Sequence, residues 1–207
     1  MKIAGAPISW GVCEVPGWGF QMSPDRVLSE MVELGLTATE FGPQGWLPVE
    51  PEARAAAVKA HGLTPVGAFF LAVMHDPDHD PIPAVKAELE AFRVAGGSVL
   101  VLACDSGRDG YDDRPVLDEQ GWATLYRNLD RIAEVCAASG VTACVHPHWG
   151  TMIQNADEVE RILGAHAALK LAERRLNFRR DLTTKYERKW LDMGKDIHHL
   201  YIEKTAL

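Results

Sequence analysis

The strongest constraint on the fold is a fivefold alternation of short apolar segments with helical segments. We predict strands at 3–9, 37–41, 64–74, 98–104 and 141–146. We predict a helix from Ser23-Pro24-Asp25 to Gly35, and further helices at 52–61, 82–95, 118–139 and 156–163. Short strands that alternate with helices are typical of parallel sheets. The sequence therefore predicts an α/β chain with about five βα units.

Five consecutive βα units allow either an open doubly wound sheet or a barrel, which normally needs eight units. A doubly wound fold more often has a glycine-rich phosphate loop after its first strand, and neither GxGxxG nor a Walker sequence stands there. Polar or aromatic residues instead occupy the C-terminal ends of five strands: Trp10, Glu40, His75, Asp105 and His146. Barrel enzymes draw their active sites from several strand ends. We therefore predict a partial (β/α)₈ TIM barrel with about five βα units and a divergent helical C-terminal tail.

The character of the chain changes after Gly164. No proline occurs beyond Pro147, and Gly194 is the one glycine beyond Gly164. The pattern predicts a long basic amphipathic helix over 165–190 and a short helical or disordered end over 192–207. We accordingly expect two parts, an incomplete barrel over 1–164 and a basic helical tail over 165–207.

The balance of charges argues against a nucleic-acid partner, because neutralising phosphates requires a basic face and the net charge is −8. Basic residues do gather in 166–207, where ten Lys and Arg accompany six Asp and Glu. Glu173 and Asp181 dilute that cluster. A solvated helix face is therefore a simpler interpretation than an element that binds a partner or a membrane surface.

No run of about eighteen apolar residues and no signal-peptide pattern occurs, so we expect no membrane partner and a cytoplasmic location. The cysteines lack CxxC spacing and stand at Cys13, Cys104, Cys136 and Cys144. Reduced structural thiols are the expected state in that compartment, with a disulfide or a reactive thiol as the alternative.

Five loop segments carry a family resemblance. They are APISWGVCEVPGWG at 6–19, TEFGPQG at 39–45, MHDP at 74–77, SGRDGY at 106–111 and HPHWGT at 146–151. In this order they resemble the βα loops of the xylose-isomerase-like TIM barrel superfamily of sugar isomerases, epimerases and dehydratases. Within it, the inosose dehydratases are the most similar group. The resemblance covers roughly residues 3–163.

The resemblance implies a metal-dependent sugar or cyclitol dehydratase or isomerase. It implies a divalent metal, commonly manganese or cobalt, and a small polyol or keto-sugar as substrate. The nearest family reaction removes water from 2-keto-myo-inositol to give a cyclic dione. A homo-oligomer is also possible.

The metal ligands of the family come mostly from later strands, in segments such as Asp-Thr-Gly-His and His-Leu-Lys-Asp, and this sequence contains neither. The strand-five position falls on His146, which we expect to be a metal ligand. The alternative is therefore a catalytically inactive, truncated family member, whose open sheet edge the new helix or another subunit covers.

Glu40 and His75 are the expected catalytic pair. Each follows an apolar strand, and a carboxylate and an imidazole can together exchange protons with a substrate. For Glu40 the competing interpretation is a solvated carboxylate at a strand end. The neighbouring loop 76–80 is rich in Asp but lacks the spacing of an EF-hand, so we do not expect it to bind metal.

The expected substrate contacts are Trp10, Arg108 and His148. Trp10 could instead be packing, and Arg108 could pair with Asp109 in solvent. Alternation along an extended segment places His146 and His148 on one side of the chain, as a site or as a structural pair. We expect Glu40, His75, His146 and His148 to converge on one cavity at the strand ends.

Overall fold

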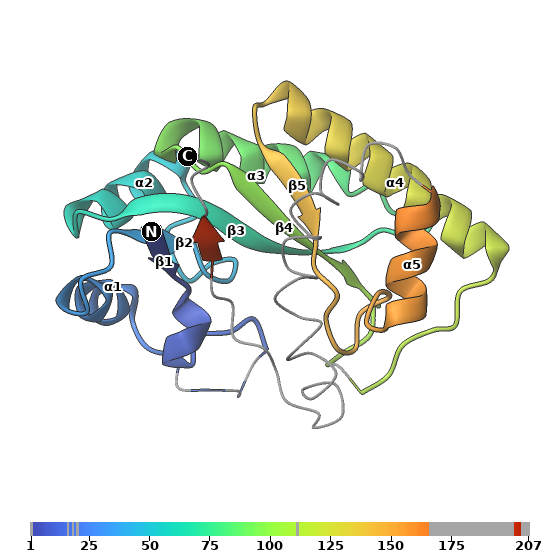
Figure 1. Ribbon diagram of the computed structural model, residues 1–207, viewed down its shortest axis with the longest axis horizontal. Coiled ribbons are helices and arrows are strands. Elements are labelled where there is room, and N and C mark those ends of the chain that lie inside the picture. The colour runs from blue at the N-terminus through green and yellow to red at the C-terminus, as the bar shows by residue number, and fades with distance from the viewer. Residues whose placement is uncertain are drawn as a thin grey trace.

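A computed structural model describes residues 2–15, 17, 19, 21–110, 112–165 and 201–203 (Figure 1). Its strands are β1 (Lys2–Gly5), β2 (Ala38–Glu40), β3 (Thr64–Val73), β4 (Val99–Asp105), β5 (Thr142–Val145) and β6 (Tyr201–Glu203). The sheet has the order β5-β4-β3-β2-β1-β6, and all pairs among β1 to β5 are parallel. The predicted α/β chain of five parallel βα units, without a switch point, is therefore confirmed.

A helix follows each of the five parallel strands. The helices are α1 (Pro24–Glu33), α2 (Pro51–Ala60), α3 (Ile82–Ala95), α4 (Glu119–Ala138) and α5 (Ala156–Ala165). α2, α3 and α4 succeed one another along the same face of the sheet (Figure 1). None of the described helices is long and apolar enough to cross a membrane.

The predicted first strand is too long at its C-terminal end. After β1, the 3-10 helix η1 (Pro7–Trp10) turns the chain, and Gly11 caps it at a φ of 80°. Pro7 has no N–H to give to a strand ladder and suits the first position of a helix. The first helix does begin with Pro24 as predicted, but the side chain of Ser23 makes no capping hydrogen bond.

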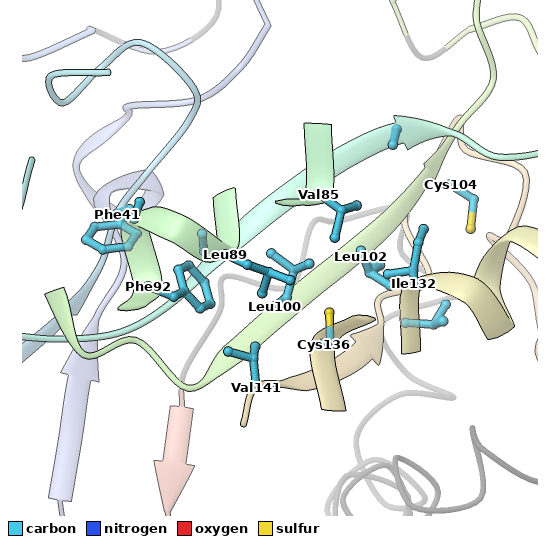
Figure 2. Packing of buried hydrophobic residues seen from close by; sticks show 14 of the residues in the cluster. Phe41, Val85, Leu89, Phe92, Leu100, Leu102, Cys104, Ile132, Cys136 and Val141 are labelled. Carbon is cyan, nitrogen blue, oxygen red and sulfur yellow. The ribbon is translucent and has the colours of Figure 1, made fainter. Parts of the chain in front are cut away.

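The main core lies between the sheet and helices α3 and α4 (Figure 2). Leu100, Leu102 and Cys104 are at most 1% exposed and pack on the helix side of β4. The intervening Val101 and Ala103 point to the opposite face, because side chains alternate along a strand, and they are also buried. β4 is therefore buried on both faces, as its apolar composition predicts.

Strands β3 and β4 pair over seven residues, from Gly67 and Val99 onward. A Cβ atom on Gly67 would clash with the backbone carbonyl oxygen of Val99. Gly67 thus permits the close approach of the two strands that carry the candidate site at their ends.

The C-terminal prediction is wrong for Tyr201–Glu203, which forms β6 instead of a helical or disordered end. These residues pair antiparallel with Lys2, Ile3 and Ala4 of β1. The free edge of β1 offers unpaired N–H and C=O groups, and such an edge favours strand pairing over the local pattern. Except for Ala165, the last residue of α5, the helix predicted over 165–190 lies outside the described residues.

Candidate functional site

An open cavity of about 410 Å³ lies at the C-terminal ends of β3 and β4, within the usual range for small-molecule sites. Its lining residues are Val73, His75, Asp76, His79, Ser106, Gly107, Arg108 and Pro115. Two residues expected in the site, His75 and Arg108, thus line the same cavity although they follow different strands.

His75 reaches the cavity because it lies two residues after Val73, on the same face of the extended chain. Met74 between them is fully buried in the core. The buried Nδ1 of His75 makes no hydrogen bond with any described residue. Burial lowers the pKa of His75 below 6.5, although the charges of Asp76 and Asp105 oppose this effect. The ring is therefore neutral at pH 7 and able to accept a proton.

Glu40 ends β2 and is 4% exposed, so the competing interpretation of a solvated carboxylate is wrong. The next residue, Phe41, packs against Phe92 of α3 and under the guanidinium of Arg54, on the helix side of the sheet. Alternation directs Glu40 to the other face, the one from which His75 enters the cavity. Glu40 is not among the residues that line this cavity.

His146 and His148 form a second cluster, with ring centroids 5.7 Å apart. Both rings lie against Phe69 of β3, at centroid distances of 6.1 Å for His146 and 6.0 Å for His148. Phe69 is on the same face of β3 as Val73, because the two residues are four positions apart along the strand. The two imidazoles thus share one side of the chain, next to the strand that leads to the cavity.

Trp10 does not line the cavity. Its indole N–H donates a hydrogen bond of 2.9 Å to Glu30 of α1. Arg108 does line the cavity and, among the described residues, makes no ion pair with Asp109. Of the four residues predicted to converge, Glu40, His75, His146 and His148, only His75 is among the described residues that line this cavity. His146 and His148 form a separate cluster against Phe69.

Sequence reasoning assigned no role to Ser106, which is 4% exposed and lines the cavity. Its hydroxyl accepts a hydrogen bond of 3.2 Å from the backbone N–H of Arg108, and this contact stabilises the loop after β4. The position of Ser106 directly after a buried strand could have identified it as a candidate site residue from the sequence. His79, in the loop 76–80, is exposed and also lines the cavity.

The described residues contain no group of three or more His, Cys, Asp or Glu side chains that could hold a metal ion. His146 and His148 offer two nitrogen ligands at most. Catalytic metal sites usually have three or four protein ligands, often including a carboxylate that balances the charge. The described donor set therefore does not fit a complete metal centre.

The sequential parallel order of β1 to β5 and the cavity at the strand ends are typical of a (β/α)₈ barrel scaffold. Residues 28–172 match the family model described as xylose isomerase-like TIM barrel. This match spans more than half of the chain, so the chain belongs to that family. The predicted resemblance is confirmed.

Relatives in this family include the inosose dehydratase of Geobacillus kaustophilus (strain HTA426). It is 28% identical over 177 residues, which cover 78% of this chain and 55% of the relative. The rhizopine catabolism protein MocC of Rhizobium meliloti is 29% identical over 170 residues, or 79% of this chain and 52% of that protein. The chain thus spans just over half the length of these relatives.

Solved structures support the same fold. An L-ribulose 3-epimerase has a TM-score of 0.58 at 13% identity, covering 79% of this chain and 57% of that one. The IOLI protein with a bound zinc atom has a TM-score of 0.57 at 14% identity, with coverage of 79% and 58%. At these identities the likeness concerns the fold alone.

Proposed function

We propose that the chain carries part of the site of an inosose dehydratase-like lyase or a sugar isomerase, with a small polyol or keto-sugar as its ligand. The observation that carries this proposal is the cavity of about 410 Å³, in which residues from the ends of β3 and β4 meet. Similarity to inosose dehydratases supports the substrate class.

In this proposal His75 is the base. Its neutral imidazole takes a proton from the carbon next to the substrate ketone. Glu40, buried at the end of β2 outside the residues that line the cavity, is the proposed acid, which donates a proton to the hydroxyl that leaves the adjacent carbon. The C–H and C–O bonds break, water departs, and the resulting enol converts to the dione.

Arg108 donates hydrogen bonds to substrate oxygens from the cavity wall, and His148 contacts the substrate from the β5 side. Trp10 supplies an apolar surface near the ring of the substrate, while Glu30 holds its indole N–H. Arg108 would act from the cavity wall and His148 from its place against Phe69, whereas Trp10 lies outside the residues that line the cavity.

We propose that His146 is a ligand of a divalent ion, with manganese or cobalt as the candidates. Because the described donors do not complete a metal centre, the chain by itself should have little or no dehydratase activity. A catalytically inactive chain is thus the alternative to the active enzyme.

Two measurements test these proposals on the purified full chain. Titration with 2-keto-myo-inositol, followed by NMR, should shift the resonances of His75 and the other cavity residues. Arg108→Ala should weaken binding about tenfold, as expected for a lost hydrogen bond to a charged group. The control Arg93→Ala, an exposed arginine on α3 that pairs with Glu90, should leave binding unchanged. Absence of binding by the wild type would contradict the proposed ligand class.

Activity is measured separately by the absorbance of the dione after addition of manganese or cobalt. We expect turnover well below about 1 s⁻¹, a rate that is ordinary for enzymes. Turnover at that rate or faster would contradict the proposed inactivity, and it would support the active dehydratase.

A further inference from the structure

The loop between β5 and α5 holds its two histidines in different ways. The backbone N–H of His146 donates to the carbonyl of Leu102 in β4, at 2.7 Å, so this residue continues the sheet. The backbone N–H of His148 donates instead to Ile153, five residues further along the same loop, at 3.0 Å. The position of His148 therefore depends on the conformation of the loop.

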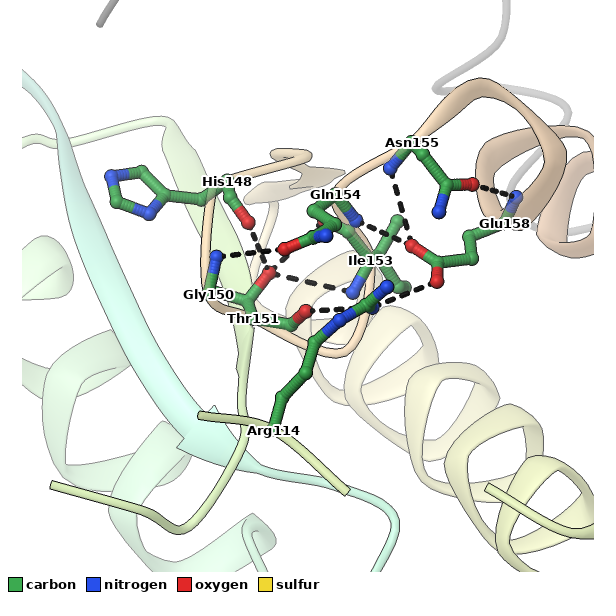
Figure 3. A network of polar contacts seen from close by, with 8 residues as sticks. All are labelled: Arg114, His148, Gly150, Thr151, Ile153, Gln154, Asn155 and Glu158. Atoms are coloured by element: carbon green, nitrogen blue, oxygen red, sulfur yellow. Dashed lines mark hydrogen bonds and ion pairs between the residues drawn. The ribbon is translucent and has the colours of Figure 1, made fainter. Parts of the chain in front are cut away.

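Thr151 connects the two ends of this loop through its side chain. Its side chain is buried, and its hydroxyl lies 2.8 Å from the carbonyl oxygen of His148 and 3.0 Å from that of Ile153. The N–H of Gly150 donates to the side-chain oxygen of Gln154 at 2.9 Å. Figure 3 shows these contacts on one side of the loop, with the imidazole of His148 directed away from them. The contacts thus hold the backbone of His148 and leave its ring outside the network.

Arg114 comes from the connection between β4 and α4 and joins the loop to the start of α5. Its guanidinium donates to the carbonyl of Thr151 at 3.2 Å and pairs with Glu158 at 2.7 Å. The side chains of Arg114 and Glu158 are 25% and 16% exposed, so solvent screens this pair less than a surface pair. One side chain thus contacts both the loop and the helix that follows it.

The other carboxylate oxygen of Glu158 accepts hydrogen bonds from the N–H groups of Gln154, at 2.8 Å, and Asn155, at 3.2 Å. The N–H of Glu158 donates in return to the side chain of Asn155 at 3.0 Å. This reciprocal arrangement is a capping box, which fixes the point at which α5 begins. Glu158 therefore links the first turn of α5 to Arg114.

We propose that Arg114 is a positioning residue for His148, acting through Thr151 and Glu158. The ring of His148 has a defined place against Phe69 because Arg114 joins the loop to α5 on the side opposite the ring. His146 needs no such support, since the sheet holds it. The assignment rests on the proposed contact between His148 and substrate.

The test uses NMR of the full chain with labelled histidines, at one fixed pH. Wild-type His148 should carry its proton on Nδ1, because this atom lies 2.8 Å from the carbonyl oxygen of Trp149, which can only accept. In Arg114→Gln we expect this single tautomer to give way to a mixture and the contact between the His148 and Phe69 rings to be lost. The contact between His146 and Phe69 should persist.

Two further variants separate positioning from general stability. Arg161→Gln removes another arginine between α4 and α5, one that contacts Glu119 and Tyr126 but not the loop, and it should leave His148 unchanged. Arg114→Lys, which keeps the charge, should restore much of the His148–Phe69 contact. The proposal is overturned if His148 keeps its wild-type tautomer and ring contact in Arg114→Gln, or if both histidines lose their contacts together.

Substrate measurements then connect the position of His148 to function. In Arg114→Gln, Kd for 2-keto-myo-inositol should rise about tenfold, the kind of loss that follows small misplacement of a contact group. An unchanged Kd together with a displaced His148 would overturn the proposed substrate role of His148 and leave its positioning by Arg114 supported. The NMR result therefore distinguishes failure of this inference from failure of the proposed function.

Discussion

Two carboxylates and the burial of the ring act in opposite directions on the imidazole of His75. The charges of Asp76 and Asp105 favour the protonated ring, whereas burial disfavours it and has the larger effect. The pKa of His75 therefore lies below its ordinary value of 6.5. A base needs this property if it is to be ready to accept a proton at neutral pH.

The same shift predicts a pH dependence of stability. Below pH 6.5 the unfolded chain binds a proton at position 75 that the folded chain does not yet bind. The free energy of unfolding should therefore fall as the pH decreases from 6.5 through the pKa of the folded state, and His75→Gln should reduce this fall. Urea denaturation at several pH values measures it. The control is His79→Gln, an exposed histidine of the same loop, and an unaltered slope in His75→Gln would contradict the prediction.

At the scale of elements, Arg54 joins α2 to its neighbours. Its guanidinium donates to both carboxylate oxygens of Glu88 in α3 at 2.9 Å, and to the carbonyl of Pro48 at 3.0 Å. It also lies over the ring of Phe41, 5.3 Å from the centroid. The two side chains of the ion pair are 9% and 13% exposed. This contact fixes α2 and α3 side by side on the sheet.

We expect Arg54→Ala to lower the free energy of unfolding by about 3–5 kcal/mol, because it leaves the carboxylate of Glu88 buried without its partner. The double variant Arg54→Leu/Glu88→Leu should recover most of this loss, since it removes both charges. Urea denaturation measures both effects. Arg93→Ala, which removes an exposed ion pair on α3, is the matched control and should change the midpoint little. A double variant as unstable as Arg54→Ala would contradict the role of the unpaired charge.

At the scale of the whole molecule, β4 occupies the most protected place among the described strands. It pairs with β3 on one side and β5 on the other, and both of its faces are buried. In the described part of the chain, β5 pairs with β4 alone. The backbone amides of β4 should therefore be better protected from hydrogen exchange than those of β5.

Hydrogen exchange of the native chain, measured by mass spectrometry of peptides, should be slowest over 100–103 in β4 and faster over β5. Opening of β5 requires the loss of one pairing, whereas exposure of β4 requires disruption of the core. Exchange in urea, where the chain is unfolded, serves as the reference for each peptide. Equal protection of β4 and β5 would contradict the prediction and indicate that the outer edge of β5 is paired.

The order and type of the five βα units could be predicted because they depend on local patterns. Apolar periodicity, the proline at the start of α1 and Gly35 after its end act within a few residues of chain. The same local signals predicted that polar residues stand at the strand ends. They failed where a neighbour decided the conformation, as at β6, which adopts the extended form along the edge of β1.

Tertiary structure decided which residues line the candidate site. His75 and Arg108 share a cavity because β3 and β4 pair in a register that brings their ends together, and Ser106 enters it through the loop conformation. The burial that lowers the pKa of His75 and surrounds Glu40 likewise arises only after packing. The sequence by itself determined which residues stand at the ends of β2 to β5, whereas Trp10 lies in the 3-10 helix that follows the shorter β1. Packing and register decided which of them meet, because distances between separate strands are not encoded in local periodicity.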